Sequence, residues 1–463
     1  MKLQQFLEHH GIARNPFAEE DAQSDQVFKD HCIHDAYHPA WDKIFGEPLE
    51  PATSVVFGEK GAGKTAMRLQ IARHLEQFNS TNPQSRRFVI QYDDFNPFID
   101  RFVESLPARR RRIDRALANW RLWDHMDAIL SIGVTELVNR ILHSAQSDRE
   151  TLSPEQLTRL DVHQRRDLLL LAANYDQSTE QPIVQRWKLL ARRLRFWSVK
   201  SLIPTALGVI VTVLVVWALF VIYGADSQEG VADLREQLPV WIYPVAILLG
   251  WAPWLWKVAT RFGTAWKVHR NLRVLNRPTT PLTKILMRLT GSELAGQPLP
   301  TQERTDDRYE LLTKFQGLLN TLGYAGMFVL VDRVDEPYLI NGSAEFMKAL
   351  IWPMLDNKFL KHPGIGVKLL LPAELKYFID REGREFSQRA RLDKQNMVPS
   401  LAWTGEALFD VANARLRACA APGSTPNVRD LFEPTITHER LLDAFRRLRV
   451  PRHLHKFLYQ LLV

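Results

Sequence analysis

Residues 53–65 read TSVVFGEKGAGKT, a short apolar stretch that leads into a glycine-rich loop. The loop, 58–65, matches the pattern G-x-x-x-x-G-K-[ST] in full, and the sequence after it, AMRLQIARHLEQF, is typical of a helix. A buried strand, this loop and a helix in that order predict backbone N–H groups turned toward phosphates. The residues expected to contact a nucleotide are Gly58, Glu59, Lys60, Gly61, Ala62, Gly63, Lys64, Thr65 and Ala66.

Two side chains of this loop have specific expected roles. The Lys64 ammonium group is expected to reach the β- and γ-phosphates, and the Thr65 hydroxyl is expected to ligate Mg²⁺. The expected cofactors are therefore ATP and Mg²⁺, and the sequence leaves open whether ATP or GTP is preferred. The alternative interpretation is a glycine-rich turn before a helix that binds no ligand.

The metal also needs an acidic ligand, and one follows a second apolar stretch. Residues 326–332 read GMFVLVD, the form of a Walker B strand that ends in aspartate. Asp332 is expected to orient Mg²⁺, directly or through water. Asp335 and Glu336 come next, and either carboxylate is a candidate to position or deprotonate an attacking water. The alternative for these two acids is a solvated turn before Pro337.

Two long uncharged stretches lie between the two motifs. Residues 203–223 read IPTALGVIVTVLVVWALFVIY, which as a helix spans roughly 30 Å, the thickness of a bilayer's hydrocarbon core. The second stretch, 237–256, is shorter and is interrupted by Pro244 and Pro253, which membrane helices tolerate. We therefore predict a transmembrane hairpin over 201–256. The alternative is a buried hairpin in a soluble core.

The charge distribution predicts how this hairpin is oriented. The chain has 60 Lys and Arg against 52 Asp and Glu, a net charge of +8. Segments 181–200 and 257–288 contain basic residues and no acidic ones, whereas the connector 225–236 is mostly acidic. By the positive-inside rule both flanks face the cytoplasm. We expect a multi-pass protein of the cell inner membrane with cytoplasmic N- and C-terminal regions. The positive charge is thus chiefly juxtamembrane, which weakens the general argument for nucleic-acid binding.

The cysteine and histidine residues argue against a scaffold built on disulfides or metal. The chain has 2 cysteines, Cys32 and Cys419, too few for a disulfide framework. His31, His34 and His38 lie near Cys32 in the sequence, and a metal site there is one interpretation. Because a zinc site needs three or four ligands in a defined geometry, we expect these side chains to be structural instead.

The segment FVLVDRVDE, 328–336, resembles the extended Walker B of STAND-type NTPases, in which an apolar strand ends in Asp and a further acidic pair follows. A transmembrane hairpin between Walker A (58–65) and Walker B (327–336) resembles the KAP group of that clade. Arg333 departs from this pattern, because the family often has a small or acidic residue at that position.

The resemblance implies an α/β P-loop NTPase with a parallel sheet, a large helical insertion that carries two transmembrane helices, and a C-terminal helical lid. It implies that Lys64 and Thr65 contact nucleotide and magnesium and that Asp332 contacts magnesium. It assigns hydrolysis to Asp335 or Glu336. It also implies a homo-oligomer, a protein partner from a neighbouring gene, and a role in prokaryotic anti-phage or other conflict systems.

The order of the predicted elements defines the organisation of the chain. Strands alternate with helical patterns after the glycine-rich loop, which predicts a parallel sheet with helices on both faces. The predicted segments are an N-terminal arm (1–50), the first half of the NTPase core (51–100), a helical insertion (101–200), the transmembrane hairpin (201–256), a helical return segment (257–322), the second half of the core (323–401) and a C-terminal helical lid (402–463).

Several arginines are further candidates for function. Arg452, beside Pro451, resembles the sensor-2 position of AAA+-like ATPases, which implies a γ-phosphate contact; the alternative is a surface arginine. Arg389 and Arg391 are candidate arginine fingers for a neighbouring subunit. The basic run ARRRRIDR, 108–115, is a candidate contact for nucleic acid or anionic lipid, although a solvated helix face is the favoured alternative.

These features favour a membrane-anchored ATPase or ATP-dependent switch that faces the cytoplasm. The first alternative is an oligomeric membrane effector, in which nucleotide is structural and the hairpin perturbs the bilayer. The second is a membrane-tethered nucleic-acid motor, for which the basic run 108–115 is the sole support.

Overall fold

One five-stranded sheet carries both motifs at the ends of its strands. The strand order is β2-β3-β4-β1-β5, and every pairing is parallel. The strands are β1 (Ser54–Gly58), β2 (Arg86–Tyr92), β3 (Tyr324–Val331), β4 (Ile365–Pro372) and β5 (Asn396–Val398). Strands β1, β3 and β4 are almost entirely buried, which explains why their sequences are apolar runs without alternation. The predicted α/β class with a parallel sheet is confirmed.

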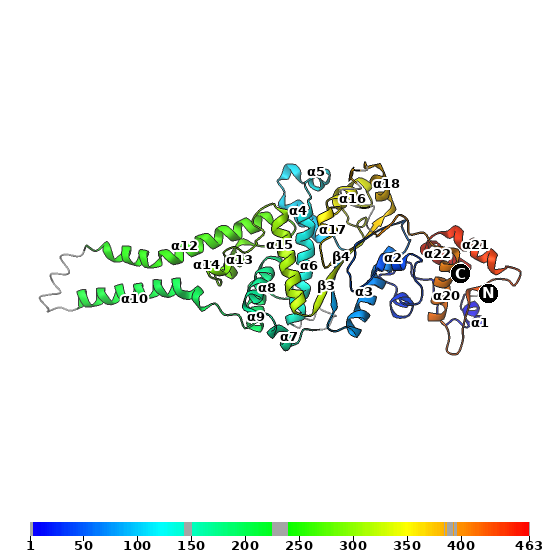
Figure 1. Ribbon diagram of the computed structural model, residues 1–463, viewed down its shortest axis with the longest axis horizontal. Helices are drawn as coiled ribbons and strands as arrows, with labels where there is room; N and C mark the ends of the chain where they lie inside the picture. The colour runs from blue at the N-terminus through cyan, green and yellow to red at the C-terminus, as the bar shows by residue number, and fades with distance from the viewer. Residues whose placement is uncertain are drawn as a thin grey trace. The chain divides into compact units, whose positions relative to one another are not determined.

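The computed structural model describes residues 3–142, 151–224, 239–383, 385–386, 392 and 396–462 (Figure 1). The chain divides into two units, Met1–His125 with Leu319–Val463, and Met126–Leu318. The sheet and both sequence motifs belong to the first unit. The acidic connector of the hairpin and the candidate fingers Arg389 and Arg391 lie outside the described residues.

Helices surround the sheet in the first unit. Its helices are α1 (Leu3–His9), α2 (Trp41–Phe45), α3 (Lys64–Thr81), α4 (Asn96–Ser105), α5 (Ile113–Leu117), α16 (Ala344–Ile351), α17 (Asn357–Leu360), α18 (Ala373–Arg381), α20 (Gly405–Ala418), α21 (His438–Leu448) and α22 (Pro451–Leu462). The stretch after residue 402 is helical as predicted, and α20, α21 and α22 share a core around Leu408, Phe445 and Leu458. The N-terminal segment contributes Phe17 to the same core.

Alternate side chains of the sheet face different helices, as the pleat of a strand requires. On one face Val56 and Phe328 pack with Ile71 of α3. On the other face the Tyr92 hydroxyl hydrogen-bonds His125 Nδ1 over 3.1 Å. His125 belongs to α6 (Leu122–Leu142), and burial lowers its pKa to about 4, so the imidazole is neutral at pH 7. Helices therefore pack on both faces of the sheet.

The second unit is helical throughout its described residues. It contains α7 (Pro154–Thr158), α8 (Val162–Tyr175), α9 (Ile183–Arg193), α10 (Ile203–Gly224), α12 (Ile242–Asn271), α13 (Thr279–Leu286), α14 (Gly291–Leu294) and most of α6 and α15 (Thr305–Thr321). Its core contains a fully buried ion pair, in which Arg308 Nη2 lies 3.1 Å from Asp127 Oδ2. The Tyr175 hydroxyl donates to Asp127 Oδ1 over 2.8 Å. These bonds compensate for burying the carboxylate.

Two helices of this unit are long and apolar enough to cross a membrane. Their apolar spans are Val199–Ile222 and Ile242–Asn271, with mean hydropathies of 2.7 and 1.3. The helices α10 and α12 lie side by side in Figure 1. Trp251 Nε1 donates to Thr212 Oγ1 over 2.9 Å, and Gly208 faces the Trp251 ring so closely that a Cβ there would lie 2.7 Å from it. Large apolar side chains such as Phe220 are exposed on the outside of the pair.

The second apolar helix differs from the sequence-based expectation in its extent. The predicted span ended at Trp256, but α12 continues without a break to Asn271. Pro253 lies inside this helix and does not end it. The boundary predicted between 256 and 257 therefore falls within a helix, because a change from apolar to basic residues is a change of environment and not of backbone conformation.

A buried lysine joins the sheet to the helix that precedes it. Lys368, in β4, is fully buried, and its Nζ donates to the carbonyl oxygens of Ile44 and Phe45 over 2.8 and 2.9 Å. These are carbonyls at the C-terminal end of α2, where a cation or a donor is favourable. Burial lowers the pKa of Lys368 to about 7, since no acidic side chain offsets the loss of water.

The titration of Lys368 predicts a pH dependence of stability. From pH about 7 to about 9.5 the unfolded chain keeps this lysine protonated, at its ordinary pKa, whereas the folded chain has released the proton. Unfolding then takes up a proton, so the free energy of unfolding rises with pH. We expect Lys368→Met to remove this rise in denaturant unfolding of the purified chain in detergent. The exposed Lys361→Met variant is the control, and an unchanged slope in Lys368→Met would contradict the assignment.

Candidate functional site

The glycine-rich loop connects β1 to α3 and requires its glycines. Gly61 and Gly63 have φ values of +88° and +92°, which side chains with a Cβ rarely adopt. A Cβ on Gly61 would also lie 2.6 Å from the Cβ of Arg452. Gly63 is the residue before α3, and no side chain caps that helix. Its first backbone N–H groups are thus oriented toward the loop, as in anion sites at helix N-termini.

The two side chains predicted to hold magnesium are in direct contact. Thr65 Oγ1, in the first turn of α3, donates to Asp332 Oδ2 over 2.9 Å. Asp332 follows β3, and the parallel sheet brings the carboxyl ends of β1 and β3 to the same edge. The Asp332 side chain is only 1% exposed. Burial raises its pKa, and the charge of Arg68 and the bond from Thr65 oppose that shift.

Lys64 lies at the same edge, and no acid among the described residues lies within ion-pair distance of its ammonium group. Its Nζ donates to the carbonyl oxygens of Gly58 and Glu59 over 2.9 and 3.1 Å, so it folds back over its own loop. Burial lowers the pKa of Lys64, and the nearby carboxylates of Asp335 and Asp332 raise it. The ammonium group therefore lies in the field of Asp332, which was predicted to orient the metal, and of Asp335, which was a candidate to position water.

Arg68 is a site residue that the sequence analysis missed. It lies one turn after Thr65 on α3 and is 1% exposed. Its Nη1 lies 2.8 Å from Asp93 Oδ2, and its Nε lies 3.5 Å from Asp332 Oδ2. Gln91 and Gln23 accept further bonds from the guanidinium group. A single arginine thus fixes two carboxylates at the ends of β2 and β3. The sequence feature that could have identified Arg68 is its position three residues after Thr65 on the same helix.

The acids after β3 differ in their surroundings. Arg333 has a φ of +60°, an uncommon conformation for a residue other than glycine. Its guanidinium lies 3.4 Å from Glu336 and 3.3 Å from Asp21. Partial burial raises the pKa of Glu336, and Arg333 opposes the shift. Asp335 is half-buried, and its charge raises the pKa of Lys64. Glu336 is exposed and forms an ion pair with Arg333. Arg333 is therefore part of the site even though it departs from the family pattern.

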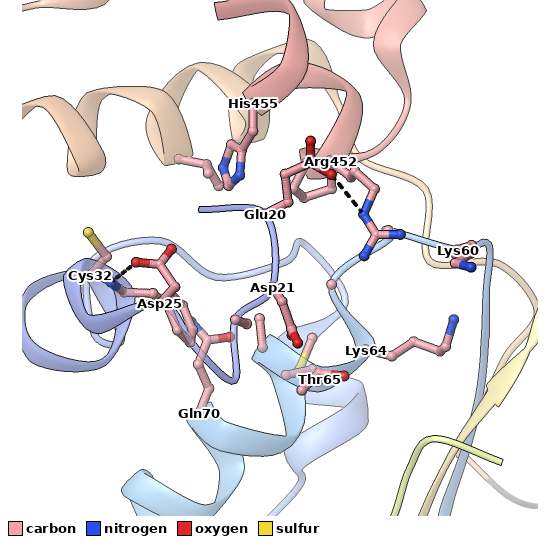
Figure 2. Close-up of a pocket in the computed structure, with 18 of the residues that line it drawn as sticks. Glu20, Asp21, Asp25, Cys32, Lys60, Lys64, Thr65, Gln70, Arg452 and His455 are labelled. Carbon is pink, nitrogen blue, oxygen red and sulfur yellow. Dashed lines mark hydrogen bonds and ion pairs between the residues drawn. The ribbon is translucent and has the colours of Figure 1, made fainter. Parts of the chain in front are cut away.

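The C-terminal helices contact the glycine-rich loop directly. The backbone N–H of Arg452 donates to the Gly61 carbonyl over 3.3 Å, and Trp403 Nε1 donates to the Ala62 carbonyl over 2.9 Å. The Arg452 side chain lies 3.8 Å from Glu20 (Figure 2). The candidate Arg452 is thus located at the loop, next to the cavity. Trp403 carried no signal in the sequence that connected it with this loop.

A cavity extends from the loop between the N-terminal segment and the C-terminal helices, as Figure 2 shows. Its charged part contains the loop residues together with the three acids after β3 and Arg452. Its other part is lined by apolar and buried polar side chains: Asp25, Phe28, Cys32, Ala36, Met67, Gln70, Val411, Ala414, Arg415 and His455. The sequence predicted an N-terminal arm over 1–50 and did not connect it with the nucleotide site. Its contribution depends on contacts distant in sequence, such as the 2.6 Å pair between Arg415 and Asp25.

The remaining candidate residues lie apart from this cavity or make structural contacts. No group of three or more side chains that could hold a metal ion occurs among the described residues. His34 and His38 make hydrogen bonds within the protein. His38, for example, hydrogen-bonds the Ala402 carbonyl over 3.0 Å. In the basic run, Arg109, Arg110, Arg111 and Arg112 are all exposed; Arg111 donates to the Leu106 carbonyl and Arg112 pairs with Asp114.

Comparisons with known proteins do not assign a function to these residues. No protein-family model, curated protein or solved structure matches the chain. What the site does is therefore inferred from its sequence motifs and from the geometry described above.

The buried position of Arg68 predicts a large effect on stability. Arg68→Met leaves the carboxylates of Asp332 and Asp93 without their shared cation, and we expect the free energy of unfolding to fall by about 3 kcal/mol. Arg73→Met on the same helix is the matched control, because Arg73 is 54% exposed and its pair with Glu76 is a surface contact. Denaturant unfolding of both variants measures the difference, and equal losses would refute the role given to Arg68.

Proposed function

We propose that this cavity binds ATP with Mg²⁺ and that the chain is a P-loop ATPase of the KAP type. The observation that carries the proposal is the contact between Thr65 and Asp332 beside a glycine-rich loop at the N-terminus of α3. A hydroxyl and a buried carboxylate are hard oxygen ligands, and Mg²⁺ in phosphate sites is bound by few protein oxygens together with phosphates. The same edge of the sheet supplies backbone donors and a lysine for those phosphates.

In this proposal each residue has a defined task. The backbone of 61–65 and Lys64 bind the phosphates, and Thr65 and Asp332 hold the cation. Bound Mg²⁺ would neutralise charge that develops on the transferred phosphoryl group. Asp335 is the favoured residue to orient water, because it is half-buried beside Lys64, whereas Arg333 engages Glu336. Arg452 would bring its positive charge to the phosphates after its guanidinium separates from Glu20. This ion pair is long, with 3.8 Å between Arg452 Nε and Glu20 Oε2.

The proposal also gives ATP a mechanical consequence. Arg452 and Trp403 hold the glycine-rich loop through its carbonyl oxygens, so a ligand in the loop acts directly on the C-terminal helices. The N-terminal segment is bonded to the same helices through Asp25 and Arg415. Nucleotide would therefore bias the arrangement of both segments, as a switch requires. From the resemblance to the KAP group we also propose that the chain forms a homo-oligomer, has a protein partner from a neighbouring gene and acts in anti-phage defence.

We further propose that α10 and α12 cross the cell inner membrane as a hairpin. The two helices pack against each other through Gly208, Trp251 and Thr212, while their outer apolar side chains are exposed. Such a surface matches lipid better than water. The basic flanks 181–200 and 257–288 favour a cytoplasmic location for both ends. A nucleic-acid motor has less support, since part of the basic run 108–115 makes local contacts.

The nucleotide site is tested by removing the loop lysine. Lys64→Ala deletes the ammonium group proposed for the β- and γ-phosphates, and we expect phosphate release from ATP by the purified chain to fall at least about a hundredfold. Lys43→Ala removes the same charge from an exposed position on α2 and should leave turnover unchanged. If Lys64→Ala hydrolyses ATP like the unmodified chain, the assignment of the site is wrong.

The membrane proposal is tested by thiol labelling in intact cells. Both native cysteines are buried. A membrane-impermeant maleimide applied from outside should label Ser227→Cys, in the acidic connector. It should label Ser80→Cys, exposed at the end of α3, only after the membrane is permeabilised. Labelling of Ser80→Cys in intact cells, or release of the protein from membranes by alkaline carbonate, would contradict the proposed topology.

A further inference from the structure

His455 is a buried polar side chain that faces the cavity without using its hydrogen-bonding capacity. It lies on α22 and is 8% exposed, and neither ring nitrogen has a hydrogen-bond partner in the part of the chain that the structure describes. Figure 2 shows its ring at the opposite side of the cavity from Thr65. Buried donors and acceptors are nearly always paired, because leaving one unpaired destabilises the fold. An unpaired imidazole that lines a cavity indicates a ligand that completes its bonds.

The imidazole is neutral in this environment. Burial lowers the pKa of His455 well below its ordinary value, and the positive charges of Arg415 and Arg452 lower it further. A neutral imidazole has one N–H donor and one nitrogen acceptor, and the choice of tautomer decides which faces the ligand. The side chain is therefore suited to a neutral polar group and not to a phosphate.

Other side chains that line the cavity offer apolar surface and a hydrogen-bond acceptor, the two features that a heteroaromatic base requires. Phe28, Met67 and Val411 contribute apolar surface to the lining of the same cavity. Gln70 also lines it, and its amide nitrogen is already bonded to the carbonyls of Ile33 and Ala36. The Gln70 side chain therefore has its carbonyl oxygen left to accept a hydrogen bond from a ligand.

The three acids that the N-terminal segment contributes to the cavity are paired with cations, and Glu20 lies 3.7 Å from Lys456 as well as 3.8 Å from Arg452. Guanine presents two adjacent donors on its pairing edge, and a free carboxylate is the group that accepts both. Asp25 is bonded to Arg415 over 2.6 Å and to the Phe28 N–H over 3.1 Å, and Asp21 pairs with Arg333 over 3.3 Å. Adenine needs one acceptor for its amine and one donor for a ring nitrogen. Neutral His455 and the Gln70 oxygen meet that need.

We propose that His455 is a specificity-determining residue, which hydrogen-bonds the base of the bound nucleotide and makes the site prefer adenine over guanine. The inference rests on the proposed function, since it assumes that the phosphates occupy the glycine-rich loop. It goes beyond that function by naming the residue that reads the base and the base that it selects.

The test measures equilibrium binding to the full chain in detergent with Mg²⁺, using ATP, GTP and inorganic tripolyphosphate. His455→Leu removes both ring nitrogens at similar volume. We expect its ATP affinity to fall about tenfold, while its GTP and tripolyphosphate affinities stay unchanged. His455→Gln restores a donor and an acceptor and should recover much of the preference. The exposed His453→Leu on the same helix is the control. Without nucleotide, His455→Leu should unfold at a higher temperature, because it removes an unpaired polar group.

Two results separate this inference from the proposed function. If tripolyphosphate and ATP bind and the ratio of ATP to GTP affinity is the same in His455→Leu as in the unmodified chain, the role of His455 is refuted and the phosphate site stands. If neither compound binds, both proposals fail. Should the leucine variant not fold, the unmodified chain is tested with 1-deaza-ATP, which keeps the adenine amine but has a C–H in place of the ring nitrogen that accepts from His455. We expect about tenfold weaker binding than ATP, and equal binding would overturn the proposal.

Discussion

The 2.9 Å hydrogen bond between Thr65 and Asp332 is the contact on which the rest of the site depends. It joins residues that are separated by almost the whole insertion and that follow different strands of one sheet. Because β1 and β3 both pair in parallel with β4, their carboxyl ends emerge at the same edge, and the loop and the acid meet there. An antiparallel pairing of either strand would carry one of them to the opposite edge.

A buried carboxylate at this edge needs compensation, and the fold supplies it from several directions. Arg68 lies between Asp332 and Asp93, so that the ends of β3 and β2 share one cation. The positive φ values of Gly61 and Gly63 allow the loop to turn, and Arg452 packs where a side chain on Gly61 would stand. Together these contacts fix the backbone of the glycine-rich loop beside the N-terminus of α3, the end of a helix that favours an anion.

Local sequence patterns predicted the elements that carry short-range signals. The loop 58–65, the apolar strand before Asp332 and the first apolar helix were visible because composition and spacing within a few residues define them. The parallel sheet followed from strands that alternate with helices. Arg68 and Trp403 were missed because their partners lie far away in the chain, and His455 was missed because the cavity that it lines forms only in the folded chain. The second apolar span was predicted to end at Trp256 because the uncharged run stops there, whereas the helix α12 continues through the basic residues to Asn271.

The N-terminal segment shows most clearly why sequence alone was insufficient. Glu20, Asp21 and Asp25 lie in irregular backbone between short helices, with no periodic pattern around them, yet they contact three different parts of the cavity wall. The contact of Asp25 with Arg415 spans almost the entire sequence, and no local rule predicts such a pair. The cavity that distinguishes this chain from a bare phosphate loop is thus a product of tertiary structure.

The central claim is that phosphates occupy the loop while Thr65 and Asp332 hold the metal. A structure of the chain with Mg²⁺ and a non-hydrolysable ATP analogue tests it most directly. The account predicts β- and γ-phosphate oxygens within hydrogen-bond distance of the backbone N–H groups of 61–65 and of Lys64 Nζ, with the metal between Thr65 Oγ1 and Asp332. A triphosphate bound elsewhere, or a Thr65–Asp332 hydrogen bond that persists with no metal beside it, would contradict the account.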